Sequence, residues 1–165
     1  MPWFEPTEDT SLSKLDHEAA RVLASVTRYL RTAVRSTNDV RSYLTQRGIA
    51  PRVRDAVLLQ ATAQGLLDDR AAARLWADHW ARRGYAWAAI HERLSQKGFD
   101  DPTIHAVALR YGSVSEDQTR ARALVAGLLR QDLSPKILAR KLASRGFDTD
   151  VIDRVLLETF GPPPA

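Results

Sequence analysis

Apolar residues recur every three or four positions along most of the chain, which is the spacing of amphipathic helices. Residues 1–13 lack this spacing, are polar, acidic and interrupted by prolines, and are predicted to form a mobile tail. The first helix is predicted from Leu15 to about Arg35. Its apolar stripe would consist of Leu15, Ala19, Val22, Leu23, Val26, Leu30 and Ala33.

Helix starts and stops then divide the chain into short helices. Ser36-Thr37-Asn38-Asp39 is a typical helix start, and Arg47-Gly48 a typical stop. Pro51 predicts the first turn of the next helix, which ends near Gly65. Later starts are predicted at the Asp68-Asp69 pair, after Gly84, at Asp101-Pro102, at a capping box of Ser115 and Gln118, at Ser134-Pro135 and at Asp148, with later stops before Gly84 and at Gly98, Gly112, Gly146 and Gly161.

Alignment on three of these glycines reveals an internal repeat. Gly48, Gly98 and Gly146 lie 50 and 48 residues apart. Residues at fixed offsets match in all three copies: Val40/Ile90/Leu138, Leu44/Leu94/Leu142, Arg47/Lys97/Arg145, Ile49/Phe99/Phe147 and Val57/Val107/Val155. Most of these matches are explained by a helix that ends at a glycine in the left-handed conformation and is followed by an apolar residue that packs back on the last turn, an arrangement we call an apolar clasp. The sequence therefore predicts an all-α protein, a tandem array of three three-helix repeats at residues 14–66, 67–112 and 113–161.

Composition narrows the function classes. The 165 residues contain no cysteine, which excludes disulfides and thiolate metal sites and suits a reducing cytoplasm. No apolar run is long enough to span a bilayer, and the first residues do not resemble a signal peptide. Residues 19–165 carry a net charge of +8, and 20 of the 24 basic residues are arginine. This balance indicates an anionic partner, either nucleic acid or an acidic protein surface.

Residue patterns for catalysis are missing. His79, His91 and His105 do not have metal-ligand spacing, and there is no glycine-rich phosphate loop. The neighbouring carboxylates of Asp68 and Asp69 would diverge on a helix, so capping is the better interpretation. We therefore predict that the protein is not an enzyme and needs no cofactor and no metal, and nothing in the sequence requires more than a monomer.

Basic residues at matched positions are the candidate binding residues. The position before each glycine gives Arg47, Lys97 and Arg145, and five residues before it stand Tyr43, Arg93 and Lys141. Members of each pair are four residues apart and share a helix face. A cation in the last turn also complements the helix dipole, which we favour for the first set. Arg93 and Lys141 lie one turn further in and favour binding.

Two further groups have competing interpretations. Of the adjacent Arg82 and Arg83, one is expected to pair with Asp78 or Glu92 while the other faces a partner. Trp76 and Trp80 are four residues apart and could stack on nucleic-acid bases. They also lie on the apolar stripe of their helix, so we expect them to pack in the core or between repeats. Tyr85 and Trp87 flank a turn, and the sequence does not decide their role.

These features together resemble the RecX family, bacterial regulators of the RecA recombinase. The resemblance covers about residues 37–160 and is strongest at Leu67-Asp68-Asp69, at Arg82-Arg83-Gly84-Tyr85 and at the Ile90, Leu94, Lys97 and Gly98 series. It implies an elongated, curved, all-helical protein that lodges in the groove of the RecA filament on DNA. It also implies restraint of strand exchange, ATP hydrolysis and co-protease activity.

Other functions remain compatible with the sequence. A helical protein could bind single- or double-stranded DNA without RecA, because short helices joined at glycine are also found in helix-turn-helix units. An adaptor for an unrelated acidic protein is the third possibility. The sequence leaves open whether DNA is contacted directly.

Overall fold

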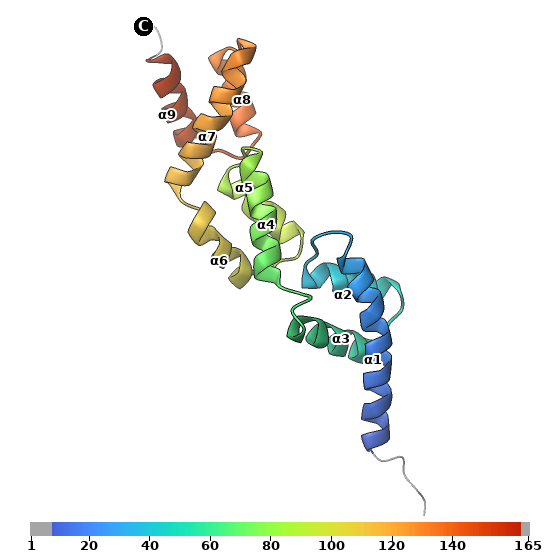
Figure 1. Cartoon of the computed structure of the whole chain (residues 1–165). Helices are drawn as coiled ribbons and strands as arrows, with labels where there is room; N and C mark the ends of the chain where they lie inside the picture. Colours follow the sequence, from blue (N-terminus) through green and yellow to red (C-terminus); the bar gives the residue numbers. More distant parts are fainter. Residues whose placement is uncertain (1–7, 163–165) are drawn as a thin grey trace, which may run out of the picture. The chain divides into compact units, whose positions relative to one another are not determined.

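The computed structural model describes residues 8–162, with side chains from Ser13 onward, and all of its regular elements are helical (Figure 1). The chain divides between Ala72 and Ala73 into two compact units. The described elements are α1 (Glu8–Leu30), α2 (Thr37–Gln46), α3 (Pro51–Ala63), α4 (Asp69–Arg82), α5 (Trp87–Gln96), α6 (Asp101–Tyr111), α7 (Val114–Leu128), the 3₁₀ helix η1 (Leu129–Gln131), α8 (Pro135–Ala143) and α9 (Thr149–Phe160). The all-α fold class is thus confirmed, whereas the boundaries of the three repeats stay a prediction.

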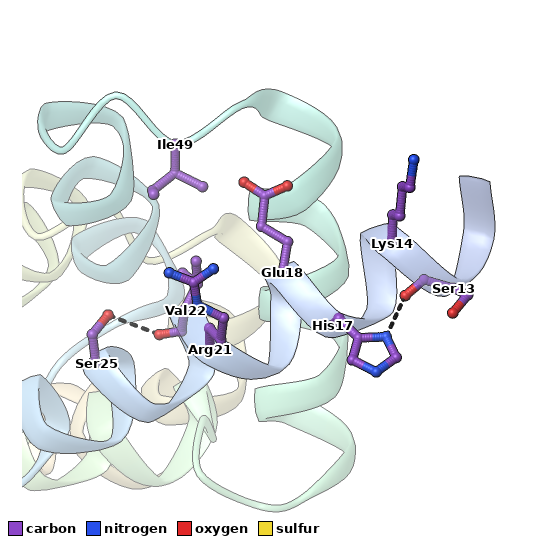
Figure 2. A pocket seen from close by; sticks show the side chains of 8 residues that line it. All are labelled: Ser13, Lys14, His17, Glu18, Arg21, Val22, Ser25 and Ile49. Atoms are coloured by element: carbon purple, nitrogen blue, oxygen red, sulfur yellow. Dashed lines mark hydrogen bonds between the residues drawn. The ribbon is translucent and has the colours of Figure 1, made fainter. Parts of the chain in front are cut away.

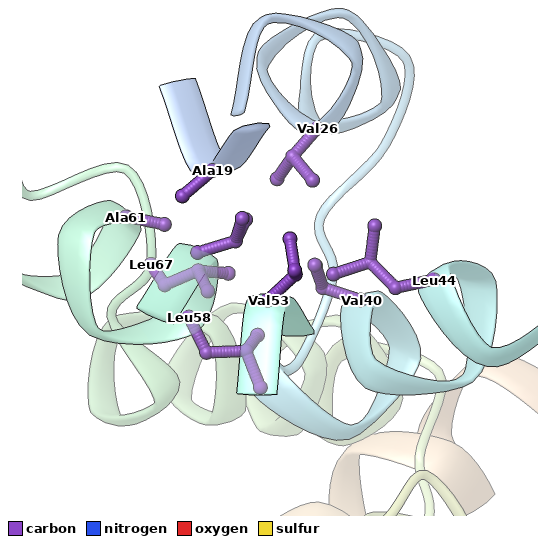
Figure 3. Close-up of a cluster of buried hydrophobic side chains, with 9 residues drawn as sticks. Ala19, Val26, Val40, Leu44, Val53, Leu58, Ala61 and Leu67 are labelled. Atoms are coloured by element: carbon purple, nitrogen blue, oxygen red, sulfur yellow. The ribbon is translucent and has the colours of Figure 1, made fainter. Parts of the chain in front are cut away.

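The N-terminal unit packs α1 and α2 onto α3 around one apolar core (Figure 3). Val26 of α1, Leu44 of α2 and Val57 of α3 are fully buried in it. The predicted apolar stripe of α1 supplies its side of this core except for Ala33, which lies beyond the end of the helix and is exposed. The whole cluster comprises Ala19, Val26, Val40, Leu44, Val53, Val57, Leu58, Ala61 and Leu67.

The limits of α1 differ from the prediction at both ends. Residues 8–13 belong to the helix and not to a mobile tail, and residues 1–7 lie outside the described part of the chain. At the other end the helix stops at Leu30 instead of Arg35. The reason is the next helix: Ser36 and Asp39 form a reciprocal capping box that holds Ser36 extended. The residues between Leu30 and Ser36 are therefore needed to reverse the direction of the chain between α1 and α2.

The C-terminal unit contains the rest of α4 together with α5 to α9. Its α7, α8 and α9 pack against one another, and α5 packs on α6. Leu138 and Leu142 of α8 are fully buried, as are Ile90 and Leu94 of α5. On the surface, Nε and Nη2 of Arg122 in α7 donate to the two carboxylate oxygens of Glu158 in α9, at 2.7 and 3.0 Å. This hydrogen bonding lowers the pKa of the Glu158 carboxyl below its usual range.

The three matched glycines have the geometry that their sequence pattern predicts. Gly48, Gly98 and Gly146 have φ of 70°, 80° and 86°. The next residue donates its backbone N–H to the carbonyl five positions earlier each time, over 3.1 Å (Ile49 to Leu44), 3.2 Å (Phe99 to Leu94) and 3.3 Å (Phe147 to Leu142). This is the closure of a Schellman-type helix end, and it confirms the predicted glycine stop with an apolar clasp.

Most predicted helix starts are confirmed, with one correction. Asp148 caps α9, Ser134-Pro135 begins α8, and Pro51 is the first residue of α3. The predicted capping box of Ser115 and Gln118 is wrong. The cap of α7 is Ser113, which accepts a hydrogen bond from the backbone N–H of Glu116 at 3.1 Å, because the helix begins two residues earlier.

Candidate functional site: cations supported by aromatic rings

The C-terminal unit places two arginine side chains on one tyrosine ring. The guanidinium carbon of Arg93 lies 4.4 Å from the centre of the Tyr85 ring, and that of Arg145 lies 4.6 Å from it. Guanidinium groups near an aromatic ring are attracted by its negative faces. Tyr85, Arg93 and Arg145 form what we call the tyrosine–arginine cluster, which joins two of the predicted binding residues.

Local backbone geometry explains why Tyr85 lies there. Helix α4 ends at Arg82, Gly84 in the following turn has a φ of 75°, and the backbone N–H of Tyr85 donates to the carbonyl of Trp80 at 3.1 Å. The ring is thereby held at the turn between α4 and α5, half-buried. Arg93 reaches it from α5, two turns further along the chain. Its guanidinium also lies 5.9 Å from the centre of the Trp80 ring.

Arg145 is fixed by its backbone and its side chain. Its carbonyl accepts a hydrogen bond of 2.9 Å from the backbone N–H of Ala86, the N-cap residue of α5. Its Nη1 donates to the carbonyl of Arg83. The turn after α8 is therefore docked on the start of α5, and the arginine is positioned before any partner binds. Such pre-organisation lowers the entropy lost on binding.

A lysine and two tryptophans lie next to the tyrosine–arginine cluster. The Nζ of Lys97 lies 3.8 Å from the centre of the Trp76 ring. The Trp76 and Trp80 rings are stacked with their centres 5.4 Å apart. Trp80 is only 7% exposed, which confirms its expected packing role, whereas Trp76 is half-buried. Arg93 in the last turn of α5 and Lys97, its C-cap residue, thus both rest on aromatic rings.

The N-terminal unit contains a second assembly of the same kind, the tyrosine pair Tyr29 and Tyr43. Their rings are parallel within 9° and their centres are 4.1 Å apart. The guanidinium of Arg35 lies 4.5 Å from the Tyr29 ring, and that of Arg47 lies 4.5 Å from the Tyr43 ring. Arg47 is exposed. Two predicted residues, Tyr43 and Arg47, are therefore in contact within this unit.

The remaining predicted binding residues, Arg82, Arg83 and Lys141, do not take part in the cation–ring contacts described above. The Arg82 side chain is 81% exposed, and its Nη2 lies 3.9 Å from Oδ2 of Asp78, the expected partner. Glu92, the alternative partner, instead accepts a hydrogen bond from Gln96. Arg83 is exposed and contributes its carbonyl to the Arg145 contact. Lys141 is exposed on α8, one turn before Arg145.

Sequence reasoning missed the aromatic partners. Tyr29 and Arg35 were not expected to take part, and the role of Tyr85 was undecided. The pattern that could have revealed Tyr85 is its place directly after a glycine stop, since the matched Ile49, Phe99 and Phe147 occupy that place elsewhere. An aromatic ring held there is near the cations of the neighbouring helix ends.

The groove beside α1 in the N-terminal unit carries both signs of charge. It holds about 530 Å³, and Figure 2 shows its lining side chains. Lys14 and Arg21 share it with Glu18, while Nδ1 of His17 is within 2.6 Å of the Ser13 carbonyl. Both signs of charge are present, so this groove differs from the predicted basic surface.

Among the side chains that the structure describes, no three His, Asp or Glu groups converge as metal ligands would. Within the same part of the chain, no helix has the length and apolar character needed to cross a membrane.

The fold and these clusters define an all-helical protein whose cationic side chains rest on aromatic rings. Comparison with known proteins assigns it to a family. No family model matches the chain. It is 33% identical over 118 residues to a protein of Pseudomonas fluorescens named Regulatory protein RecX, covering 68% of this chain and 75% of the relative. It is 31% identical over 146 residues to Regulatory protein RecX of Thermobifida fusca, covering 84% and 78%.

Solved structures show the same fold. The crystal structure of RecX from Lactobacillus salivarius matches with a TM-score of 0.74 and 18% identity, over 87% of this chain and 97% of that one. A second crystal structure of regulatory protein RecX matches with a TM-score of 0.71 and 18% identity, over 94% and 80%. The chain belongs to the RecX family, which confirms the resemblance drawn from its motifs.

Proposed function

We propose that this protein regulates the RecA recombinase by binding along the RecA–DNA filament and restraining strand exchange, ATP hydrolysis and co-protease activity. It would act in the cytoplasm as a monomer and by binding alone. Its relatives are named regulatory proteins, which supports a regulatory role. The binding residues would be Tyr43, Arg47, Arg82, Arg83, Arg93, Lys97, Lys141 and Arg145.

The observation that carries the proposal is the tyrosine–arginine cluster. Within residues 13–162, whose side chains are described, neither Arg93 nor Arg145 forms an ion pair. Their guanidinium groups rest on Tyr85, so their charges are available to an acidic partner. Arginine matches carboxylate with two parallel hydrogen bonds, which adds geometric specificity to charge attraction.

The regulatory effect would follow from contact with more than one filament subunit. Cationic residues occur on both units of the chain, Arg47 on the first and Arg93 and Arg145 on the second. Once one of two linked binding surfaces has bound, the other is held near its own target at a high effective concentration. A protein bound to neighbouring subunits would oppose the rearrangements that filament growth and strand exchange require.

The test is DNA-dependent ATP hydrolysis by RecA, titrated with this protein, together with co-sedimentation on RecA filaments. Wild type should inhibit and co-sediment, and the double variant Arg93→Glu, Lys141→Glu should do both more weakly. Arg130→Glu is the matched control, because Arg130 is an exposed arginine of the same unit outside the proposed binding residues. Failure of the wild type to co-sediment at moderate salt would reject the proposal.

Binding to nucleic acid without RecA is the second candidate, and the net charge of +8 on residues 19–165 favours it, because a basic surface attracts phosphates. The N-terminal tyrosine pair does not offer a stacking platform, since its rings stack on each other and Arg35 and Arg47 cover their outer faces. Salt dependence separates the candidates. Affinity for naked DNA would fall steeply, with a log–log slope of about −0.7 to −0.9 per phosphate contact. A RecA-specific regulator should instead bind filaments much more tightly than naked DNA.

A further inference from the structure

A groove on the C-terminal unit joins exposed apolar surface to two arginines. It holds about 300 Å³ and is lined by Arg74 of α4 and by residues of α6. Leu109 lines it and is 83% exposed, more than the other large apolar side chains of the described residues. The complete lining is Arg74, Ala106, Val107, Leu109 and Arg110. We call it the α4–α6 groove.

Its positive charge is not neutralised from within the groove. No acidic residue lines it, and Arg74 and Arg110 are both exposed. Asp78, one turn beyond Arg74 on α4, already accepts a hydrogen bond from the Tyr111 hydroxyl and pairs with Arg82. The groove therefore combines an apolar wall with two cations that lack a carboxylate there.

One wall of the groove is held rigidly. Tyr111 is only 5% exposed, and its hydroxyl bond to Asp78 ties the end of α6 to α4. The Arg110 guanidinium lies 5.4 Å from the centre of the Tyr111 ring. The carbonyl of Tyr111 accepts a hydrogen bond of 2.7 Å from the buried Arg120. A partner would thus meet a preformed surface.

We propose that the α4–α6 groove binds an acidic amphipathic segment of the filament protein, and this rests on the proposed function above. An apolar side chain of that segment would cover Leu109 and the adjoining half-buried Ala106, above Val107, which is only 2% exposed. Carboxylates on either side of it would pair with Arg74 and Arg110. A single exposed leucine is ordinary on a protein surface, but one beside a groove with unneutralised charge fits a segment of this composition.

The apolar wall favours a protein segment over DNA. Phosphates would use the two arginines but would leave Leu109 in water, and no aromatic residue lines the groove to stack on a base. Removing the leucine should therefore affect binding of the protein segment and leave phosphate contacts unchanged. This difference makes Leu109→Ser the informative variant.

The experiment compares Leu109→Ser with Leu59→Ser, whose leucine is 74% exposed on α3. Co-sedimentation on RecA filaments and binding to naked single-stranded DNA are measured for both. Leu109→Ser should weaken filament binding roughly ten-fold, the equivalent of burying part of one leucine. Leu59→Ser should bind as wild type. The double variant Arg74→Gln, Arg110→Gln should weaken filament binding as well.

Three outcomes would overturn the inference, and they are distinguishable. If Leu109→Ser binds filaments like wild type while Arg93→Glu binds weakly, the groove is not a contact and the proposed function stands. If both arginine changes reduce binding to naked DNA and Leu109→Ser has no effect, the groove contacts phosphate. If wild type itself does not bind filaments, the proposed function fails and the groove has no partner of this kind. Unchanged circular dichroism of each variant verifies folding.

Discussion

The carboxylate of Asp117, in the first turn of α7, accepts a hydrogen bond of 2.8 Å from the backbone N–H of Trp87, the first residue of α5. A second pair of elements has the same arrangement at positions 50 and 48 residues earlier, which is the spacing of the repeat. Asp69 of α4 accepts hydrogen bonds from the backbone N–H of Thr37 at 2.7 Å and from its hydroxyl at 3.0 Å. In both cases a carboxylate 30 or 32 residues later in the chain accepts a hydrogen bond from the backbone N–H of the first residue of a helix, which has no partner within its own helix.

Loss of the Asp117 carboxylate should destabilise the C-terminal unit strongly. Asp117 also accepts from Nη2 of Arg120, whose side chain is only 8% exposed. The Asp117→Ala variant would leave that buried charge with the neutral Tyr111 carbonyl and with one carboxylate, that of Glu116 at 3.7 Å. We expect a loss of about 3–5 kcal/mol in the free energy of unfolding. Urea denaturation followed by circular dichroism measures it.

Glu116→Ala is the matched control for this prediction. Its carboxylate pairs with the same arginine but is 52% exposed. An exposed partner at this distance is expected to contribute less than about 1 kcal/mol. Equal losses for Asp117→Ala and Glu116→Ala would contradict the role of Asp117 as the principal partner of Arg120.

The position of a glycine relative to its neighbours should decide how well it tolerates alanine. Both Gly48 and Gly146 have positive φ, which costs an alanine about 1–2 kcal/mol. A Cβ at Gly48 would meet nothing within 4 Å, whereas at Gly146 it would lie 2.7 Å from the Cβ of Ala89. Overpacking of this kind adds about 1–3 kcal/mol. Thermal denaturation should therefore show Gly146→Ala to be the less stable variant, and the reverse order would contradict this close approach.

Helix ends and core positions could be predicted from the sequence, because they depend on local chemistry. The matched Val40, Ile90 and Leu138 are all fully buried, as the repeat alignment predicts. Asp68 caps its own helix through the backbone N–H of Ala71 at 2.9 Å, as expected for the acidic pair. Asp69 could not be assigned in this way, because its partner Thr37 is 32 residues distant.

The candidate site was predictable only in part, for the same reason. Charge and spacing indicated Arg93 and Arg145, but nothing in the sequence links them to one ring. Their meeting depends on the turn after α8 docking on the start of α5 through the Arg145 carbonyl. Tertiary contacts between distant segments decide which cations share an aromatic partner, and periodicity along one helix does not report them.

Alkaline pH should destabilise the protein through Tyr111. Burial, helped by its hydrogen bond to Asp78, raises the pKa of Tyr111 from 10.0 to about 12. The folded state therefore favours the neutral phenol. Its contribution to stability is complete below pH 10, where the hydroxyl is neutral in both states, and is lost as pH rises to about 12. Unfolding free energies between pH 9 and 12 should fall less steeply for Tyr111→Phe than for wild type, and parallel curves would contradict this assignment.

The last prediction concerns Tyr85 as the support of the cationic surface, and it assumes that the protein binds RecA filaments as proposed. Tyr85→Phe keeps the aromatic face beneath Arg93 and Arg145, so filament binding should remain within about two-fold of wild type. Tyr85→Leu keeps the apolar bulk but removes the ring. Each cation–ring contact contributes about 0.5–1 kcal/mol at an exposed site, so two lost contacts should weaken binding roughly ten-fold.

The charge of the surface is the same in both tyrosine variants, which separates support of the arginines from simple attraction. If Tyr85→Leu binds filaments as tightly as Tyr85→Phe, the ring does not position the arginines for binding. The salt dependence gives a second readout: because neither variant changes the number of cations, the log–log slope of affinity against salt should be the same for both. A reduced slope for Tyr85→Leu would mean that a displaced arginine no longer reaches the partner, so that the ring determines which charges make contact and not only how firmly they are held.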